Sequence, residues 1–464
     1  MDVELQILKH LKRSPRETVS IIDRYCDSYN DLFSDVRNYE CFKYLHQGII
    51  SSIKRKSLPE IAKITGINSP QSLHHFIANS PWSVKQLEQR RLTLTLEALK
   101  EEKITVVIDE TGDRKKGKKT NYVARQYLGS IGKIDNGIVT VNAYGVYENI
   151  TFPLMFKVFK PRSTLKESDT YKTKIELASL IITELVEFGF EIELVLARKA
   201  MLCQSSKTTI CADALRLYGE ASSFIRTLEK HNLPWVVAIR NNHGVWLPRE
   251  QKVRANKWCK FIRTFSNQQS ETRYVREIIY GKRRSRTYWE VTTDPETMPS
   301  NSTSFVMTNI QATRSKMKQQ IGNLYGLRTW VEYGFRQCKQ ELGWTDYRFT
   351  NFKEINKWWE IIFSAYWMVS CSSKVFCQLN QSQSLSIQKN QGQQLVSHFN
   401  LHQQWVNQEG WKTTLNNLRL IIQPTIIFWM IIPWLDVFPN RSLLLGFHRL
   451  IATMNQFSFY LPDG

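Results

Sequence analysis

The chain has 464 residues, and its 63 Lys and Arg residues exceed its 42 Asp and Glu residues to give a formal net charge of +21 at pH 7. A hydrophobic content of 42% is ordinary for a folded soluble protein, and the length allows roughly two to four domains. The positive charge favours a polyanionic partner, most often nucleic acid, over a merely basic soluble protein, and no amphipathic lysine-rich helix supports a membrane-surface role.

The first hundred residues have apolar positions at helical spacing and no alternating strand pattern, which predicts a helical region. Within it, residues 57–80 (SLPEIAKITGINSPQSLHHFIANS) have the layout of a helix-turn-helix. Leu58, Ile61 and Ile64 would line one face, and the TGINSP segment would supply the turn and the start of the second helix. The second helix of such a motif can enter a DNA major groove, although an ordinary helical hairpin has the same pattern.

From about residue 103 the pattern changes to strands separated by helices. Ile104–Ile108 is a short apolar run that is expected to end as a strand at Asp109. Further strands are predicted over residues 137–147, 152–159, 192–197 and 235–239, and helices over residues 171–188 and 218–232. The polar, basic residues 241–310 alternate in places and predict a mostly β insertion, which long helices follow over residues 315–342 and 352–370.

The C-terminal part contains a polar stretch and an apolar one. Residues 378–408 are rich in Gln, Ser and Asn, which indicates a loop or weakly ordered linker. The most apolar run, residues 425–435, is too short to span a bilayer and is interrupted by proline, so buried packing is expected. The eight cysteines form no C-x-x-C pair and the N-terminus has no apolar signal core, which together indicate reduced thiols in the cytoplasm.

Four polar residues recur at helical spacing in NLYGLRTWVEYGFRQCKQELGW, residues 323–344: Tyr325, Arg328, Glu332 and Lys339. Their offsets place them within roughly 60° of one another around a helix. One face would then present a phenol, a guanidinium, a carboxylate and an ammonium group, which suits a metal ligand flanked by phosphate-binding groups. A solvated face with Arg–Glu pairing is the alternative.

Asp109 stands at the expected end of a strand, in VVIDETGDRKKGKKTNY, which is a common position for a catalytic ligand. Glu110 and Asp113 are nearby alternatives. The loop that follows is strongly basic and suits a DNA backbone, with a solvated charge run as the alternative reading; its lysines are Lys115, Lys116, Lys118 and Lys119.

The pattern Y-x2-R-x3-E-x6-K resembles the glutamate-helix signature of the DDE-class insertion-sequence transposases. The segment IDETGDRKKGKKT resembles the surroundings of that group's first aspartate, and LYGEASSF, residues 217–224, resembles the stretch after the second. The similarity covers about residues 100–375. It implies an α/β fold: a ribonuclease-H-like mixed sheet flanked by helices, with a β-rich insertion and an N-terminal helical domain.

The same resemblance implies a division of the chain by function. The implied parts are a helical DNA-binding domain over residues 1–100, a catalytic domain over residues 101–375 with its insertion over residues 235–310, and a C-terminal linker and helical region over residues 376–464.

The resemblance also implies a magnesium-dependent endonuclease and strand transferase. Asp109, Asp213 and Glu332 would be the catalytic residues and would bind two Mg²⁺ ions, with Mn²⁺ as a substitute. Tyr325, Arg328, Lys339 and the lysine loop would contact phosphates. Trp330 and Trp344 are candidates to stack on an extruded base, but core packing is the favoured reading for both.

The implied partners are double-stranded DNA, as terminal inverted repeats and target, and a second copy of the chain on that DNA. No membrane partner is expected. The implied location is the bacterial cytoplasm, in association with the nucleoid.

The sequence departs from the family pattern at the second aspartate. Arg198 follows the strand IELVLA, and about seventeen residues then intervene before LRLYGE, with Asp213 as the one aspartate among them. Either a new strand end delivers Asp213 to the metals, or the insertion leaves a degenerate, inactive copy that acts only as a DNA-binding protein. A different nuclease with the same core is a third possibility. A shift of even about 1 Å sharply reduces catalysis, so the two readings of Asp213 differ in activity.

Overall fold

The computed structural model describes residues 13–117, 119–129, 131–148, 150–197, 222–239, 254–264, 270–279, 286–300, 302–310, 321, 326–327, 329–381, 401–406, 408 and 410–456. By packing, the chain divides into two compact units. Unit 1 combines Met1–Ala98 with Arg336–Gly464, and unit 2 is Leu99–Phe335. The functions expected for the three parts of the sequence remain predictions.

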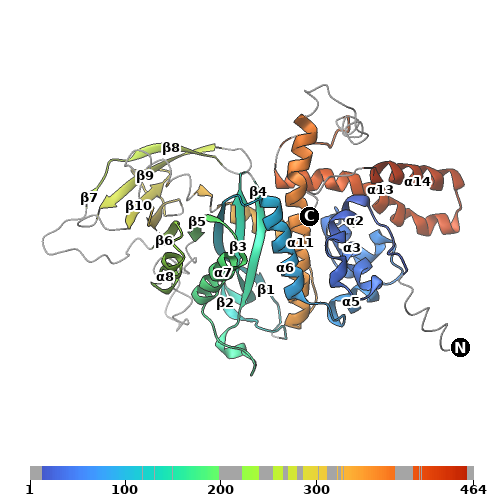
Figure 1. Cartoon of the computed structure of the whole chain (residues 1–464), viewed down its shortest axis with the longest axis horizontal. Coiled ribbons are helices and arrows are strands. Elements are labelled where there is room, and N and C mark those ends of the chain that lie inside the picture. Colours follow the sequence, from blue (N-terminus) through green and yellow to red (C-terminus); the bar gives the residue numbers. More distant parts are fainter. Residues whose placement is uncertain are drawn as a thin grey trace. The chain divides into compact units, whose positions relative to one another are not determined.

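Unit 2 contains one large mixed sheet (Figure 1). Its strands are β1 (Ile104–Arg114), β2 (Ala124–Leu128), β3 (Lys133–Tyr147), β4 (Ile150–Phe159), β5 (Ile192–Ala197), β6 (Trp235–Ile239), β7 (Arg254–Ala255), β8 (Cys259–Thr264), β9 (Ser270–Ile279), β10 (Thr287–Thr292) and β11 (Ser304–Thr308). Its helices are η2 (Arg162–Thr164), α7 (Lys174–Phe188), α8 (Ser222–Lys230) and α10 (Thr329–Arg336).

The centre of the sheet is β1, which has antiparallel neighbours on one side and parallel ones on the other. β3 pairs antiparallel with β1, and β4 with β3. β5 pairs parallel with β1, and β6 parallel with β5, so crossovers carrying α7 and α8 connect these strands. This mixed sheet flanked by helices confirms the ribonuclease-H-like fold class expected from the sequence.

The β-rich insertion extends the same sheet. β11 pairs antiparallel with β6 and continues through β10 and β9 to β7, while β8 pairs with β9. The expected insertion began at residue 235, but Trp235–Ile239 is β6, a parallel member of the core. The inserted strands are therefore β7–β11, seen in yellow in Figure 1.

The expectation that β1 ends at Asp109 is wrong, because the strand continues to Arg114. The pairing with β5 stops at Ile108, whereas the pairing with β3 goes on to Arg114. The polar residues after Asp109 remain in a strand because their backbone groups pair with β3. Asp109 therefore lies at the end of the parallel part of β1.

Unit 1 is helical among its described residues, as the pattern of the first hundred residues predicted. Its helices are α2 (Ser20–Asp27), η1 (Asn30–Leu32), α3 (Val36–Ile50), α4 (Leu58–Thr65), α5 (Gln71–Ala78), α6 (Val84–Leu99), η5 (Gln337–Glu341), α11 (Phe352–Gln381), α13 (Trp411–Val437) and α14 (Arg441–Asn455). α11 packs against α3, α5 and α13. Of the expected linker at 378–408, the first four residues belong to α11, and most of the others lie outside the described residues.

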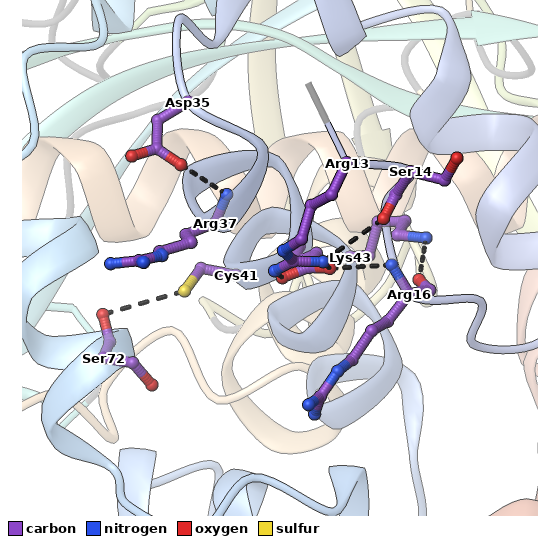
Figure 2. Close-up of polar contacts among 9 residues, drawn as sticks. Arg13, Ser14, Arg16, Asp35, Arg37, Cys41, Lys43 and Ser72 are labelled. Carbon is purple, nitrogen blue, oxygen red and sulfur yellow. Dashed lines mark hydrogen bonds and ion pairs between the residues drawn. The ribbon is translucent and has the colours of Figure 1, made fainter. Parts of the chain in front are cut away.

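The extended segment before α2 is fixed to α3. Both oxygens of Glu40 accept hydrogen bonds from Arg13, each at 2.7 Å, and one also accepts from the backbone N–H of Arg16 (Figure 2). Lys43 donates to the carbonyl of Arg16 and pairs with Asp23 at 2.8 Å. These contacts fix the chain entering the helical bundle to one side of α3.

Helices α4 and α5 form the helix-turn-helix layout that the sequence predicted. The turn begins at Gly66, which has a left-handed φ of 69°. A side chain there would collide with Trp429, since a Cβ atom would lie 2.4 Å from its ring. Glycine is therefore required both by the backbone conformation and by the close approach of α13.

The expectation that residues 425–435 are buried is wrong for much of the run. α13 continues through Pro424 and Pro433 as one helix, and α14 returns beside it. Trp434 is 68% exposed and Met430 is 59% exposed, because α14 covers only part of α13. Within the described residues, α13 is the one helix whose length and composition would allow it to cross a membrane, which alone is weak evidence for a span.

A buried polar network joins α2, α3 and α11. His46 is fully buried, with Nδ1 2.9 Å from the carbonyl of Phe42 and Nε2 2.9 Å from the hydroxyl of Ser364. The carbonyl can only accept, so Nδ1 carries the proton and Nε2 accepts from Ser364. Burial lowers the pKa of His46 to about 4, so the side chain is neutral in the folded protein.

We expect this histidine to make the protein less stable in mild acid. Because the folded pKa lies below the ordinary value of 6.5, the unfolded chain binds the proton first, and the contribution to stability falls between pH 6.5 and about 4. The loss is about 1.4 kcal/mol per pH unit in that window. Glu360, which pairs with the buried Arg91, opposes it, since burial raises the pKa of that carboxyl and its contribution grows as pH falls.

A comparison of wild type with His46→Gln separates the contribution of His46 to the pH dependence of stability from that of Glu360. Denaturant unfolding at pH 7 and pH 5 should show a smaller loss of stability in the variant, although the variant starts less stable. Equal pH dependence of the two proteins would show that His46 is not the titrating group.

Candidate active site

Asp109 is buried in the sheet of unit 2, with 5% of its surface exposed. It lies opposite Asn142 of β3, and its Oδ1 accepts the backbone N–H of Glu110 at 2.8 Å. Opposed residues on antiparallel strands point to the same face, and alternate residues point the same way. Asp109, Asn142 and Tyr144 therefore share one face of the sheet.

Helix α10, which carries Glu332, packs on that same face. The ring of Phe335 meets the ring of Tyr144 edge-on at a centroid distance of 5.4 Å. A Cβ atom at Gly334 would lie 2.7 Å from Tyr144, so the absence of a side chain lets the helix approach β3 closely. Glu332 is partly exposed, and the fully buried Val331 precedes it. The helix that carries Glu332 thus contacts Tyr144, on the sheet face to which Asp109 points.

The neighbouring carboxylate, Glu110, points to the opposite face. It forms an ion pair with Lys174 at 2.5 Å, at the start of α7. On that face Lys157 of β4 also pairs with Glu184 of α7, at 2.8 Å. α7 is fixed at its own start by a capping box between Thr173 and Glu176. Glu110 is therefore part of the contact between sheet and helix rather than a neighbour of α10.

Asp113 shares the face of Asp109 but lies four residues farther along β1, which is about 13 Å in a strand. It forms an ion pair with Lys115 at 2.7 Å, and Arg114 pairs with Asp135 at 2.7 Å. Lys116 and Lys119 are exposed. The basic loop thus exposes the cations of Lys116 and Lys119, whereas Asp113 balances the charge of Lys115.

The expected helical stretch over residues 315–342 is confirmed from residue 329 on, although its last turn is not α-helical. α10 ends at Arg336, and Gln337–Glu341 form a π-helical turn that contains Lys339. The regular 100° spacing therefore does not continue from Glu332 to Lys339, and Lys339 belongs to unit 1. Four expected site residues lie outside the described residues: Asp213, Tyr325, Arg328 and Lys118.

The donor set at this face fits a divalent cation. Carboxylate oxygens are the ligands that Mg²⁺ prefers, and Asp109 is a buried carboxylate on the sheet face whose Tyr144 contacts Phe335 of α10. The residues that the structure describes contain no group of three metal-ligating side chains. The third expected ligand, Asp213, falls outside them.

Sequence reasoning overlooked Asn142, which shares the face of Asp109, and the contact between Tyr144 and α10. Asn142 is almost fully buried, and its amide donates to the carbonyl and the hydroxyl of Thr140. The sequence could have indicated Asn142, because it is one polar amide within the largely apolar run VTVNAYGVY. Tyr144 and Gly334 carried no comparable signal, because their contact joins distant segments. Trp344 packs in the core as favoured, stacked on Trp359 at 4.7 Å.

Comparison with known proteins gives three matches. A family model described as "DDE superfamily endonuclease" matches residues 31–260, and one described as "Transposase DDE domain" matches residues 195–368. The chain is also 48% identical over 344 residues to the "Probable transposase for insertion sequence element IS701" of Microchaete diplosiphon. That similarity covers 74% of this chain and 85% of the relative.

Proposed function

The chain belongs to the DDE transposases of insertion sequences, and from that membership we propose that Asp109, Asp213 and Glu332 form its catalytic triad. The observation that carries the proposal is the packing of α10 on the sheet face to which Asp109 points. Enzymes of this family generally use divalent metal ions. We propose that here the three carboxylates hold two Mg²⁺ ions, for which Mn²⁺ can substitute.

In this proposal each residue has a distinct task. Asp109 is held rigidly by β1 and by the N–H of Glu110, so its carboxylate needs no reorganisation when substrate binds. Glu332 presents a second carboxylate from a helix fixed by Tyr144. Tyr325, Arg328 and Lys339 bind phosphates and orient the scissile bond. When bound, the metal pair supplies Lewis acidity for an in-line phosphoryl displacement by water or a 3′-hydroxyl.

The proposal is tested with DNA that carries the terminal inverted repeats flanking the gene. Purified protein should nick these ends in Mg²⁺ or Mn²⁺ and then join them to a target duplex. EDTA should stop both reactions but leave binding to the repeats in place, because the phosphate contacts come from protein cations. Cleavage without joining would point to a different nuclease, and binding without cleavage to a DNA-binding protein alone.

We further propose that the loop with Lys115, Lys116, Lys118 and Lys119 contacts the DNA backbone. Replacing all four by Ala should weaken binding of every duplex and flatten its salt dependence, since each lost phosphate contact removes about 0.9 from the slope of log K against log salt. Lys115 should contribute least, because Asp113 balances its charge. A loss confined to one DNA sequence would make the loop a base reader instead.

The expected assembly is a homodimer on paired terminal repeats, acting in the bacterial cytoplasm at the nucleoid. Mass measurement of the cleavage-competent complex should give two copies per pair of ends. Coupled cleavage of both ends by a single copy would refute the dimer, and a fluorescent fusion spread evenly through the cell would refute the nucleoid association.

A further inference from the structure

Asn142 is buried in the second half of β3, directly opposite Asp109 of β1. It is 1% exposed, and its neighbours Val141 and Ala143 are apolar residues that point to the other face of the sheet. A primary amide in such a place loses its hydrogen bonds to water, which costs free energy unless its polar atoms find new partners. The partners of the two polar atoms therefore indicate what this side chain does.

The amide nitrogen of Asn142 is engaged by Thr140, two residues earlier on the same face. Nδ2 donates to the Thr140 carbonyl at 3.1 Å and to the Thr140 hydroxyl at 2.9 Å. A carbonyl oxygen can only accept, so the atom that faces Thr140 is the nitrogen, and the orientation of the amide follows. Within the part of the chain that the structure describes, no group donates a hydrogen bond to Oδ1.

The carboxylate of Asp109 lies beside this amide. Residues directly opposed on antiparallel strands point to the same face and have Cβ atoms about 4.5–5.5 Å apart. Asp109 is itself buried, and its Oδ1 accepts the backbone N–H of Glu110 at 2.8 Å. Because both N–H groups of Asn142 are used by Thr140, the amide has only its oxygen left for a ligand at this face.

The surroundings of this pair are largely apolar. Phe156 of β4 lies opposite Asn142 on its other side, and Tyr144, two residues farther along β3, contacts Phe335 of α10. Phe156 and Tyr144 are buried. Water screens a cation weakly in such a place, so an oxygen ligand there contributes more to its binding than the same oxygen would at the surface.

The β3 side of Asp109 is also the side that the insertion in the chain does not interrupt. On the other side of β1, β5 ends at Ala197, which pairs with Ile108, and the insertion follows that strand end. By contrast, β3 is continuous over Lys133–Tyr147. An oxygen donor on β3 therefore keeps its place beside Asp109 independently of the residue that follows β5.

We propose that Asn142 is a further ligand of the divalent cation at Asp109, with the amide oxygen as the donor atom. The proposal rests on the proposed function, which places that cation at Asp109. Carbonyl and carboxylate oxygens are both ligands of hard divalent cations. A neutral amide adds an oxygen without adding negative charge, so it supports Asp109 without repelling the phosphate that the site must accept.

The test measures metal binding to the full chain in the absence of DNA, from the loss of the electron paramagnetic resonance signal of free Mn²⁺. Asp109→Asn should remove this binding, which identifies the site that is measured. Asn142→Ala should weaken it at least about tenfold, the scale of loss when a supporting group at a metal site is removed. Asn142→Asp should bind Mn²⁺ at least as tightly as wild type, because it keeps an oxygen at the same place and adds charge.

A change of donor atom gives a readout that a purely structural role of Asn142 would not alter. Sulfur is a softer ligand than oxygen, so Cd²⁺ should displace Mn²⁺ from Asn142→Cys at a lower concentration than from wild type. Asn142→Ser is the matched control, since it has a similar shape with oxygen in place of sulfur, and it should show no such shift toward Cd²⁺.

Asn417 of α13 provides a control for the loss of a buried amide. It is also 1% exposed, and its amide both donates to and accepts from the backbone of Val406. Asn417→Ala should lose stability, as Asn142→Ala does, but keep the Mn²⁺ affinity of wild type. Thermal unfolding shows which variants are folded, and if Asn142→Ala is not, the comparison of Asn142→Cys with Asn142→Ser decides.

Two results would overturn the proposal in different ways. If wild type binds Mn²⁺ through Asp109, while Asn142→Ala binds it equally well or Asn142→Cys shows no shift toward Cd²⁺, Asn142 is not a ligand and the proposed function stands. If Asp109→Asn leaves the Mn²⁺ binding of wild type unchanged, the metal site at Asp109 is wrong, and both proposals fail.

Discussion

Asp109→Asn and Glu332→Gln should each lower the rate of terminal-repeat cleavage by at least about 10⁴-fold, the scale of loss when a member of a catalytic unit is removed. Each change keeps the size of the side chain and removes the negative charge that a divalent cation requires. DNA binding should survive, because the phosphate contacts come from Lys and Arg. The measurement is single-turnover cleavage in Mg²⁺, with binding followed separately by fluorescence anisotropy.

Glu110→Gln is the matched control for Asp109→Asn. It changes the adjacent carboxylate, but one that points to the opposite face and pairs with Lys174. We expect it to cleave at a rate within a few-fold of wild type, with some loss of stability from the broken ion pair. If Glu110→Gln abolished cleavage and Asp109→Asn did not, the assignment of the two faces would be reversed.

Asp213→Asn should remove cleavage to a similar extent if the insertion after β5 still delivers a third carboxylate to the site. A repaired chain tests the other reading, in which the insertion leaves a degenerate, inactive copy. β5 ends at Ala197, which pairs with Ile108, the residue directly before Asp109 in β1. Deleting about seventeen residues after Ala197 and placing an aspartate there recreates the family pattern at that position.

The results of Asp213→Asn and of the repaired chain together distinguish the two readings of the insertion. Loss of activity in Asp213→Asn assigns the third ligand, and full activity rules Asp213 out. Cleavage gained only by the repaired chain identifies the natural sequence as a displaced, inactive form. If neither the natural nor the repaired chain cleaves, the protein acts on DNA by binding alone.

The sequence predicted the core strands because their patterns depend on local burial. Residues 192–197 and 235–239 were bounded correctly, since each is a short, mostly apolar run that is buried except at Glu193. β1 was bounded too early because its second half is polar, and its pairing with β3 keeps that half extended. Hydrophobicity predicts strands that pack on both sides, whereas strands held mainly by hydrogen bonds leave a weaker signal.

The candidate site was predictable in its residues but not in its geometry. Asp109 and Glu332 were found from spacing and resemblance, and Asn142 carried a visible signal as a buried amide. The contact between Tyr144 and Gly334 joins residues 190 positions apart, so no local pattern reports it.

The division of unit 1 into two stretches has a consequence for how the chain is made. Helices α3 and α4 pack against α11 and α13, yet about 240 residues separate Ala98 from Arg336. A ribosome adding roughly 5–20 residues per second needs about 10–50 s for that interval. During this delay the faces of α3 and α4 that pack against α11 and α13 in the finished chain lack those partners. A product truncated at Phe335 should therefore aggregate or be degraded, so that only ribosomes that finish the message yield protein able to act on DNA.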